Sequence, residues 1–192
     1  MSEMALEYKL RPFTVDEYHR MAEAGVLDPE ERVELIDGAI VEMSPIGKTH
    51  WARHARIVKY LIQTLGASAE VVGQSSLPLG TRDEPQPDVA ILAPRTYEGP
   101  APYPSPAEIY AAIEIADTSL RKDLGPKLRL YARHGIADHL VVDVNEDVLL
   151  HYRDPHDGGY RACERLGAEN VFSLRALPGI TLAARAFLGT SD

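Results

Sequence analysis

The stretch "AAIEIADTSLRKDLGPKLRLYARHGIADHLVVDV" (residues 111–144) decides the fold class. It begins with a short apolar run that is typical of a central strand, and it ends with a second such run. Between them, "KDLGPKLRLYARHG" predicts a helix that ends at Gly135. A strand, a helix and a second strand in this order predict a βαβ crossover, and therefore a sheet that contains parallel strands.

The residues before this stretch predict a helix and a hairpin. "FTVDEYHRMAEAG" begins with Thr14 and has Glu17 three residues later, which is the capping-box pattern of a helix start. "RVELIDGAIVEMSP" alternates between apolar and polar residues on both sides of Asp37 and Gly38. This pair between alternating runs is the strongest short signal for a β-hairpin.

The rest of the chain predicts one more helix and several strands. "THWARHARIVKYLIQTLG" (residues 49–66) has apolar residues at a helical period, at Trp51, Ala55, Val58, Leu61, Ile62 and Leu65. Strands are predicted in residues 69–80 and 85–92 and, after the crossover, in "DVLLHYRD" and "GYRACERLG". Residues 93–106 predict a flap or an exposed loop. Together they predict an α/β (α+β) fold with a central mixed sheet flanked by helices.

Length and composition limit the class of protein. With 192 residues, of which 45% are hydrophobic, the chain is sized for one good core, so we expect a single domain over residues 1–192. The first residues lack the apolar region of a signal peptide, and no window approaches a membrane span. The one cysteine excludes a disulfide within the chain. We therefore expect a soluble cytoplasmic protein with no membrane contact.

The formal net charge of −9 argues against a protein that coats nucleic acid, because such proteins are basic. It does not exclude a nuclease, since a metal ion can meet the phosphate in an enzyme that is acidic overall.

Four acids and one lysine lie at the ends of predicted elements. Asp88 precedes a strand, Glu114 lies within an apolar strand, and Glu34 lies in the first hairpin strand. Asp123 and Lys127 are four residues apart on the predicted helix and so share one face. A buried acid needs a cation, a metal or a proton. Magnesium prefers hard oxygen ligands, usually one or two carboxylates with water and phosphate, so a metal site is one way to satisfy these acids.

Each of these residues also has a structural interpretation. Asp88 is compatible with an acid in a proline-rich turn, and Glu114 with a buried ion pair to Lys127 or Arg129. Lys127 is compatible with an exposed lysine or a pair with Asp123. For Glu34 the alternative is an edge-strand acid that faces water.

Several basic residues in the second predicted helix have two interpretations as well. His50, near the helix start, is more often a cap or a surface residue than a group that contacts phosphate. Arg53, Arg56 and Lys59 recur every three residues and would either follow a phosphate backbone or face water, as on any amphipathic helix.

Three residues are expected to be structural. We expect Tyr131 to pack in the core and Asp143 to mark the end of its strand. Cys163 has no motif of a nucleophile around it. The chain also lacks a P-loop, a dinucleotide-binding GxGxxG, a GxSxG elbow and an HExxH motif.

The ordered blocks "VELIDGAIVEMSP", "QPDVAIL" and "IEIADTSLRKDLGPKLRLYARHGIADHLVVD" resemble the Uma2 family, formerly a domain of unknown function. That family belongs to the PD-(D/E)xK restriction-endonuclease-like superfamily. The resemblance extends from about Phe13 to about Arg153, and the order of the blocks is far more specific than the dipeptide "PD" alone. Asp117 stands where many members have serine.

The resemblance implies roles for the acids and the lysine. In the superfamily, the aspartate after proline and the acid of the next strand bind metal, which corresponds to Asp88 and Glu114. The usual lysine position is Ala116 here, and the resemblance implies that Lys127 on the adjacent helix takes its role. Glu34 matches a family acid on the hairpin and would complete the metal site.

The implied activity is phosphodiester hydrolysis by an endonuclease that depends on Mg²⁺ (or Mn²⁺), with nucleic acid, and DNA first, as substrate. We expect the substrate to enter a cleft between these strands and residues 93–106, and a homodimer is plausible for cutting both strands. The alternative is a non-catalytic protein with a nuclease fold that serves as a binding or regulatory partner.

Overall fold

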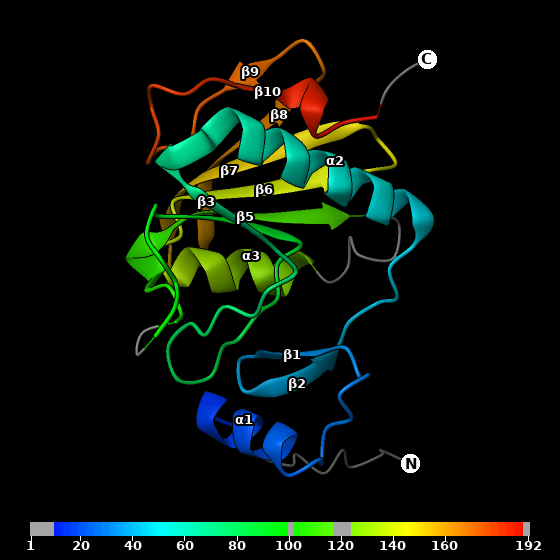
Figure 1. Ribbon diagram of the computed structural model, residues 1–192, viewed down its shortest axis with the longest axis vertical. Coiled ribbons are helices and arrows are strands. Elements are labelled where there is room, and N and C mark those ends of the chain that lie inside the picture. Colours follow the sequence, from blue (N-terminus) through cyan, green and yellow to red (C-terminus); the bar gives the residue numbers. More distant parts are fainter. Residues whose placement is uncertain (1–9, 100–101, 117–123, 190–192) are drawn as a thin grey trace, which may run out of the picture.

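A six-stranded mixed sheet forms the centre of the protein, in the order β3-β4-β5-β6-β7-β8 (Figure 1). The computed structural model describes residues 10–99, 102–116 and 124–189. The strands are β3 (Glu70–Gly73), β4 (Val89–Leu92), β5 (Ile109–Ala116), β6 (Asp138–Asp143), β7 (Val148–His156) and β8 (Gly159–Leu166). β5 and β6 pair in parallel, and the other neighbours pair antiparallel. The predicted mixed sheet is confirmed.

The described residues also contain three α-helices, two small sheets and three short 3₁₀ helices. The α-helices are α1 (Val15–Glu23), α2 (Lys48–Leu65) and α3 (Leu124–Arg133). The small sheets are formed by β1 (Val33–Ile36) with β2 (Ala39–Glu42), and by β9 (Val171–Phe172) with β10 (Leu182–Ala183). The 3₁₀ helices are η1 (Gly66–Ser68), η2 (Pro106–Glu108) and η4 (Ala184–Ala186). No helix in the described ranges is long and apolar enough to cross a membrane.

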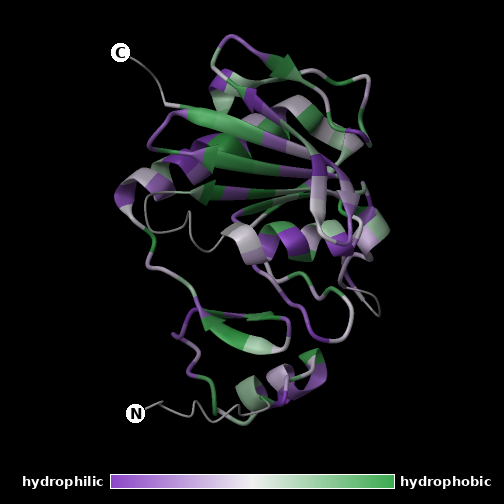
Figure 2. Ribbon diagram, turned by 180° about the vertical axis from the view of Figure 1, so that it is seen from behind, coloured by the Kyte–Doolittle hydropathy of each residue, from purple (hydrophilic) through white to green (hydrophobic). Residues whose placement is uncertain are grey.

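The two faces of the sheet are covered differently. On one face, α2 and the C-terminal segment bury residues such as Ile57, Leu61 and Phe187 against the strands. On the other face, α3 packs Leu130 and Tyr131 in a second cluster. Figure 1 shows α2 and α3 on opposite sides of the sheet, and Figure 2 shows that the central strands are largely hydrophobic. This double burial explains why β4, β5 and β6 read as continuous apolar runs in the sequence.

The predicted crossover is present, since α3 lies in the chain between β5 and its parallel neighbour β6. Alternate residues of a strand point to opposite faces. Ile113 and Ile115 therefore belong to the core beneath α2, while Glu114 points toward α3. Asp117 and Asp123 lie outside the described residues.

The N-terminal helix and hairpin form as expected. Thr14 and Glu17 complete the capping box of α1. Asp37 and Gly38 form the hairpin turn, both with positive φ, as a type I′ turn requires. A side chain at position 38 would also collide with Pro12, 2.5 Å from the added Cβ.

Backbone bonds hold the hairpin against the segment that leads to β4. The amide of Leu35 donates to the Glu84 carbonyl at 3.2 Å, and the Glu84 amide donates to the Leu35 carbonyl at 2.7 Å. The amide of Gly38 donates to the Arg82 carbonyl at 2.8 Å. Since neighbouring side chains on β1 alternate in direction, this attachment fixes the direction of Glu34 as well.

Two local predictions are wrong. The strand predicted over residues 69–80 is confined to Glu70–Gly73. The inward face of α2 is also different, because its buried residues are His50, Ile57, Leu61 and Leu65. Trp51, Ala55 and Ile62, which were assigned to the apolar face, are exposed. Both faces of this helix carry apolar residues at a helical spacing. The buried face begins with the polar residue His50, so the sequence pattern did not identify it as apolar.

Candidate functional site

Asp88 and Glu114 come together because their strands are neighbours. Val89 pairs with Ile113 in the antiparallel ladder, so the residue before β4 is level with the one after Ile113. The amide of Ile115 donates to Asp88 Oδ2 at 2.7 Å, which fixes that carboxylate beside the strand of Glu114. The structure thus brings the two predicted acids to one place.

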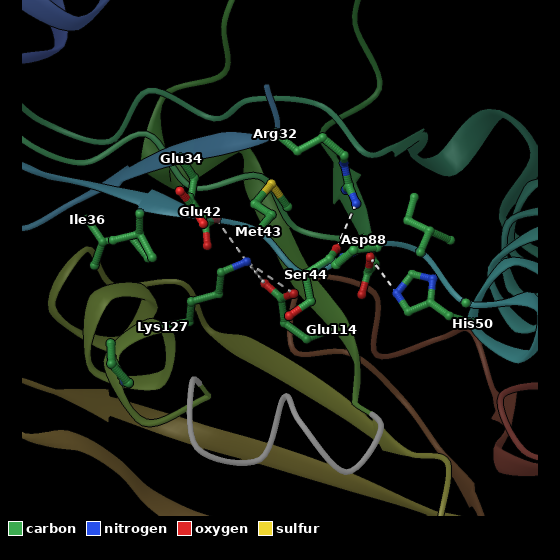
Figure 3. A pocket seen from close by; sticks show the side chains of 15 residues that line it. Arg32, Glu34, Ile36, Glu42, Met43, Ser44, His50, Asp88, Glu114 and Lys127 are labelled. Atoms are coloured by element: carbon green, nitrogen blue, oxygen red, sulfur yellow. Dashed lines mark hydrogen bonds and ion pairs between the residues drawn. The ribbon is translucent and has the colours of Figure 1, made fainter. Parts of the chain in front are cut away.

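Lys127 and Glu34 meet at the same place. Lys127 Nζ lies 2.9 Å from Glu34 Oε2 and 3.2 Å from Glu114 Oε1 (Figure 3). Glu34 Oε2 also accepts a hydrogen bond from the Gln86 amide at 3.0 Å. The four predicted side chains are buried, each only 6–8% exposed. Glu34 therefore does not face water, and Lys127 is not a solvated lysine.

Tyr131 contributes more than packing. It lies one helical turn after Lys127, and its hydroxyl donates to Glu114 Oε1 at 2.8 Å. Burial, together with the neighbouring Glu114 carboxylate, raises the pKa of Tyr131 well above its ordinary value, so the phenol keeps its proton. The prediction that Tyr131 only packs was therefore incomplete. Its spacing of four from Lys127 is the signal that would have revealed this contact.

His50 is the second residue that sequence reasoning misjudged. It is buried, rather than a surface or cap residue, and its Nε2 lies 2.9 Å from Asp88 Oδ1. The neighbouring His54, one turn further along α2, places Nε2 3.0 Å from the Asp88 carbonyl oxygen, where the ring N–H donates. α2 thus holds both the side chain and the backbone of Asp88. The spacing of four between the two histidines was the available signal.

The basic residues of α2 do not form a phosphate track. Arg53 Nη1 lies 3.1 Å from Asp147 Oδ1 and 3.1 Å from the Phe187 carbonyl oxygen, so it binds the C-terminal segment. Arg56 is half-buried and Lys59 is exposed. Arg53 therefore tethers α2 to the C-terminal segment, and the three residues do not act as one basic face.

The site opens into a cavity of about 180 Å³. Its lining comes from the hairpin, from the segment that joins β2 to α2, from the starts of α2 and α3, and from Asp88 and Glu114. None of the described residues of the loop 93–106 lines it. The hairpin, rather than the described part of this loop, therefore bounds the cavity. Arg32, Ser44 and Met43 are lining residues that the sequence did not single out (Figure 3).

Carboxylates outnumber cations in the cavity. Four acids line it, Glu34, Glu42, Asp88 and Glu114, against Arg32 and Lys127. Burial raises the pKa of Glu114 to about 7; Lys127 opposes this rise, and the Asp88 and Glu34 carboxylates add to it. Burial alone would lower the pKa of Lys127, but Glu114 and Glu34 outweigh it and raise that pKa above its ordinary value.

These residues fit a hard divalent cation by their chemistry. Carboxylate oxygens are the ligands that Mg²⁺ and Mn²⁺ prefer, and four carboxylates line this cavity against two cationic side chains. Within residues 10–99, 102–116 and 124–189, no three His, Cys, Asp or Glu side chains are grouped so that they could hold a metal ion. In Figure 3 the Lys127 ammonium pairs with both Glu34 and Glu114, so a cationic side chain lies between these two carboxylates.

Comparison with known proteins points to nucleases. The Uma2 family, described as "Putative restriction endonuclease", matches residues 15–185. A crystal structure of a "putative nuclease belonging to DUF820" from Anabaena variabilis superposes with a TM-score of 0.71 and 16% sequence identity, covering 92% of this chain and 97% of that one. At this identity the structural match shows a common fold. No protein of curated function matches the chain.

Proposed function

Since the chain belongs to the Uma2 family of restriction-endonuclease-like proteins, we propose that it is a metal-dependent nuclease that hydrolyses phosphodiester bonds of nucleic acid, with DNA as the first candidate. One observation carries this proposal. Glu34, Asp88, Glu114 and Lys127 come from four separate parts of the chain and converge, buried, at one cavity. A fold gains nothing in stability from a surplus of buried carboxylates, so their convergence favours a function.

Asp88 and Glu114 would hold the cation, with Glu34 as a third carboxylate close by. A bound Mg²⁺ or Mn²⁺ supplies charge stabilisation at a phosphoryl oxygen and lowers the pKa of a coordinated water. The residues around these acids keep them in position: Ile115 and His50 hold Asp88, and Tyr131 holds Glu114.

Lys127 would act as a fixed positive charge. Its raised pKa keeps the ammonium protonated at neutral pH, which makes it a poor general base. The ammonium is therefore suited to stabilising the negative charge that develops on the phosphate and to orienting a water by donating to it. From α3, Lys127 reaches the Glu114 carboxylate. In the superfamily the lysine usually stands two residues after this acid, at the position of Ala116 on β5.

The alternative is a non-catalytic protein on the same scaffold that binds a partner. It is favoured by the pairing of Lys127 with both Glu34 and Glu114, which lets the site persist as an internal ion cluster.

Metal binding and cleavage separate the two. Millimolar Mn²⁺ should raise the melting temperature by about 5 °C for a well-occupied site. Asp88→Asn and Glu114→Gln should abolish this rise and lower cleavage by about a thousandfold. Glu164→Gln, which removes an exposed carboxylate from β8, is the matched control and should change neither.

The measurements are thermal denaturation with and without Mn²⁺, and cleavage of single-stranded and duplex DNA and RNA. If none of these substrates is cleaved in Mn²⁺, the enzyme proposal is wrong and the non-catalytic alternative stands.

A further inference from the structure

The cavity has an apolar wall in addition to its carboxylates. The wall comes from the hairpin, the segment after it and the start of α3, and consists of Ile36, Val41, Met43, Pro45, Ile46 and Pro126. A cavity of roughly 150 Å³ in a protein accepts one benzene-sized ring, and this one measures about 180 Å³. There is room here for one ring-sized group beside the acids, and no room for a double helix.

Apolar side chains are also exposed around the entrance. Val41 and Ile46 line the cavity and are more than one-third exposed. Trp51, the only tryptophan in the chain, is 66% exposed. Its amide donates to the carbonyl of Gly47, a lining residue, at 3.0 Å, so its backbone lies one helical turn from a residue of the cavity. A large aromatic ring in this position offers a stacking surface.

Charge limits how a nucleic acid can be held here. The cavity carries more carboxylates than cations, and the whole chain has a formal net charge of −9. A long duplex is held through many phosphate contacts with Lys and Arg, each of which releases counterions. On α2, Arg53 is paired with Asp147 and Arg56 is half-buried, so of the three basic residues Lys59 is the exposed one. Affinity therefore has to come from stacking and apolar contact rather than from a phosphate track.

From these three observations we infer that the substrate is presented as a single strand, with one unpaired base in the cavity against its apolar wall and a neighbouring base stacked on Trp51. This inference rests on the proposed nuclease function and names its substrate class. The buried acids are then reached by a nucleotide that leaves the stack, which is least costly where the strand is already unpaired. Stacking on an aromatic ring is tolerant of sequence, so we expect little base preference.

Binding is tested without cleavage by replacing Mg²⁺ with Ca²⁺, which takes the same oxygen ligands. A labelled single-stranded oligonucleotide of eight nucleotides, as DNA and as RNA, is compared with the blunt duplex of the same sequence by fluorescence anisotropy. We expect the single strand to bind about tenfold more tightly and to quench the fluorescence of Trp51. Trp51→Ala should weaken single-strand binding about tenfold, and Trp51→Phe should retain most of it.

Ile62→Ala is the matched control, because Ile62 is an exposed apolar residue on the same helix, 53% exposed and three turns from Trp51. It should leave binding unchanged. Equal loss in Ile62→Ala and Trp51→Ala, or a dimer in sedimentation that Trp51→Ala dissociates, would identify this face of α2 as a protein interface and overturn the inference.

The outcomes also separate this inference from the proposed function. Cleavage of duplex in Mn²⁺ with no advantage for single strands refutes the substrate class and leaves the nuclease standing. Tight single-strand binding at Trp51 without cleavage of any substrate supports the binding site and refutes the nuclease.

Discussion

Two of the regions in which the protein buries ionisable groups differ in their balance of charge. In the sheet, Asp138 and His151 are almost completely buried and form a pair, with His151 Nε2 2.6 Å from Asp138 Oδ1. The second oxygen of Asp138 accepts from the Arg175 amide at 2.8 Å. In the cavity, three buried carboxylates share one lysine and one histidine.

This contrast indicates which buried charges point to a function. Asp138 is one carboxylate beside one histidine, and both of its oxygens are hydrogen-bonded, so we assign this pair to packing. Glu114 shares its one cationic partner, Lys127, with Glu34. Burial raises the pKa of Glu114 to about 7, although Lys127 lowers it, and the residue borders a cavity that a ligand can enter. Burial alone does not separate the two regions, whereas unbalanced charge beside open space does.

Removal of the lysine from the cavity should have the largest effect. Lys127→Met should lower the free energy of unfolding by about 3 kcal/mol without metal, because Glu34 and Glu114 lose their buried cation. Mn²⁺ should restore more stability to this variant than to the wild type. Urea denaturation with and without Mn²⁺ measures both effects.

Lys59→Met is the control, since Lys59 is an exposed lysine of α2 and should matter little. A Lys127→Met protein that is as stable as the wild type without metal would show that the ammonium does not balance the carboxylates.

The second largest effect is expected in the sheet, where a fall in pH should lower the stability of the protein through His139. His139 is fully buried among Tyr131, Tyr152 and Tyr160, and its Nδ1 donates to the Ala112 carbonyl oxygen at 3.1 Å. Burial lowers its pKa from 6.5 to about 3. Below pH 6.5 the unfolded chain binds a proton at His139 that the folded protein does not bind. The stability that the lowered pKa of His139 contributes is therefore present above pH 6.5 and is lost as the pH falls toward 3.

Through this residue the wild type should lose about 2 kcal/mol of stability between pH 7 and pH 5. In His139→Phe that portion of the pH dependence should vanish, whatever the stability of the variant at pH 7. Denaturation at both pH values provides the measurement, with the exposed His156→Phe as control. An identical pH dependence in His139→Phe and wild type would refute the assignment.

The smallest effect is expected at His50, which acts on the site through Asp88. His50→Ala should weaken Mn²⁺ binding by about tenfold, as is common when a group that orients a metal ligand is removed. His50→Gln, which keeps a donor, should recover part of the affinity. Titration with Mn²⁺ followed by melting temperature measures the difference, and unchanged affinity in His50→Ala would exclude a positioning role.

Much of the fold was predictable because local chemistry and final structure agree. The Asp37-Gly38 turn, the capping box of Thr14 and Glu17, and the apolar run around Glu114 each have one dominant local solution. The face of α2 was not predictable in this way. Its apolar residues fit two faces, and the choice depended on what the sheet and C-terminal segment needed to bury.

Some features of the candidate site could likewise be predicted from the sequence, and others could not. The sequence alone determined that Asp88, Glu114 and Lys127 belong to one strand–helix framework, because the order of apolar runs dictates which elements are neighbours. Only the tertiary structure decided that Glu34 turns inward, that His50 and Tyr131 hold the acids, and that the hairpin rather than the loop 93–106 forms the cavity wall. The physical reason is that these contacts join segments far apart in the chain, where no local pattern constrains the direction of a side chain.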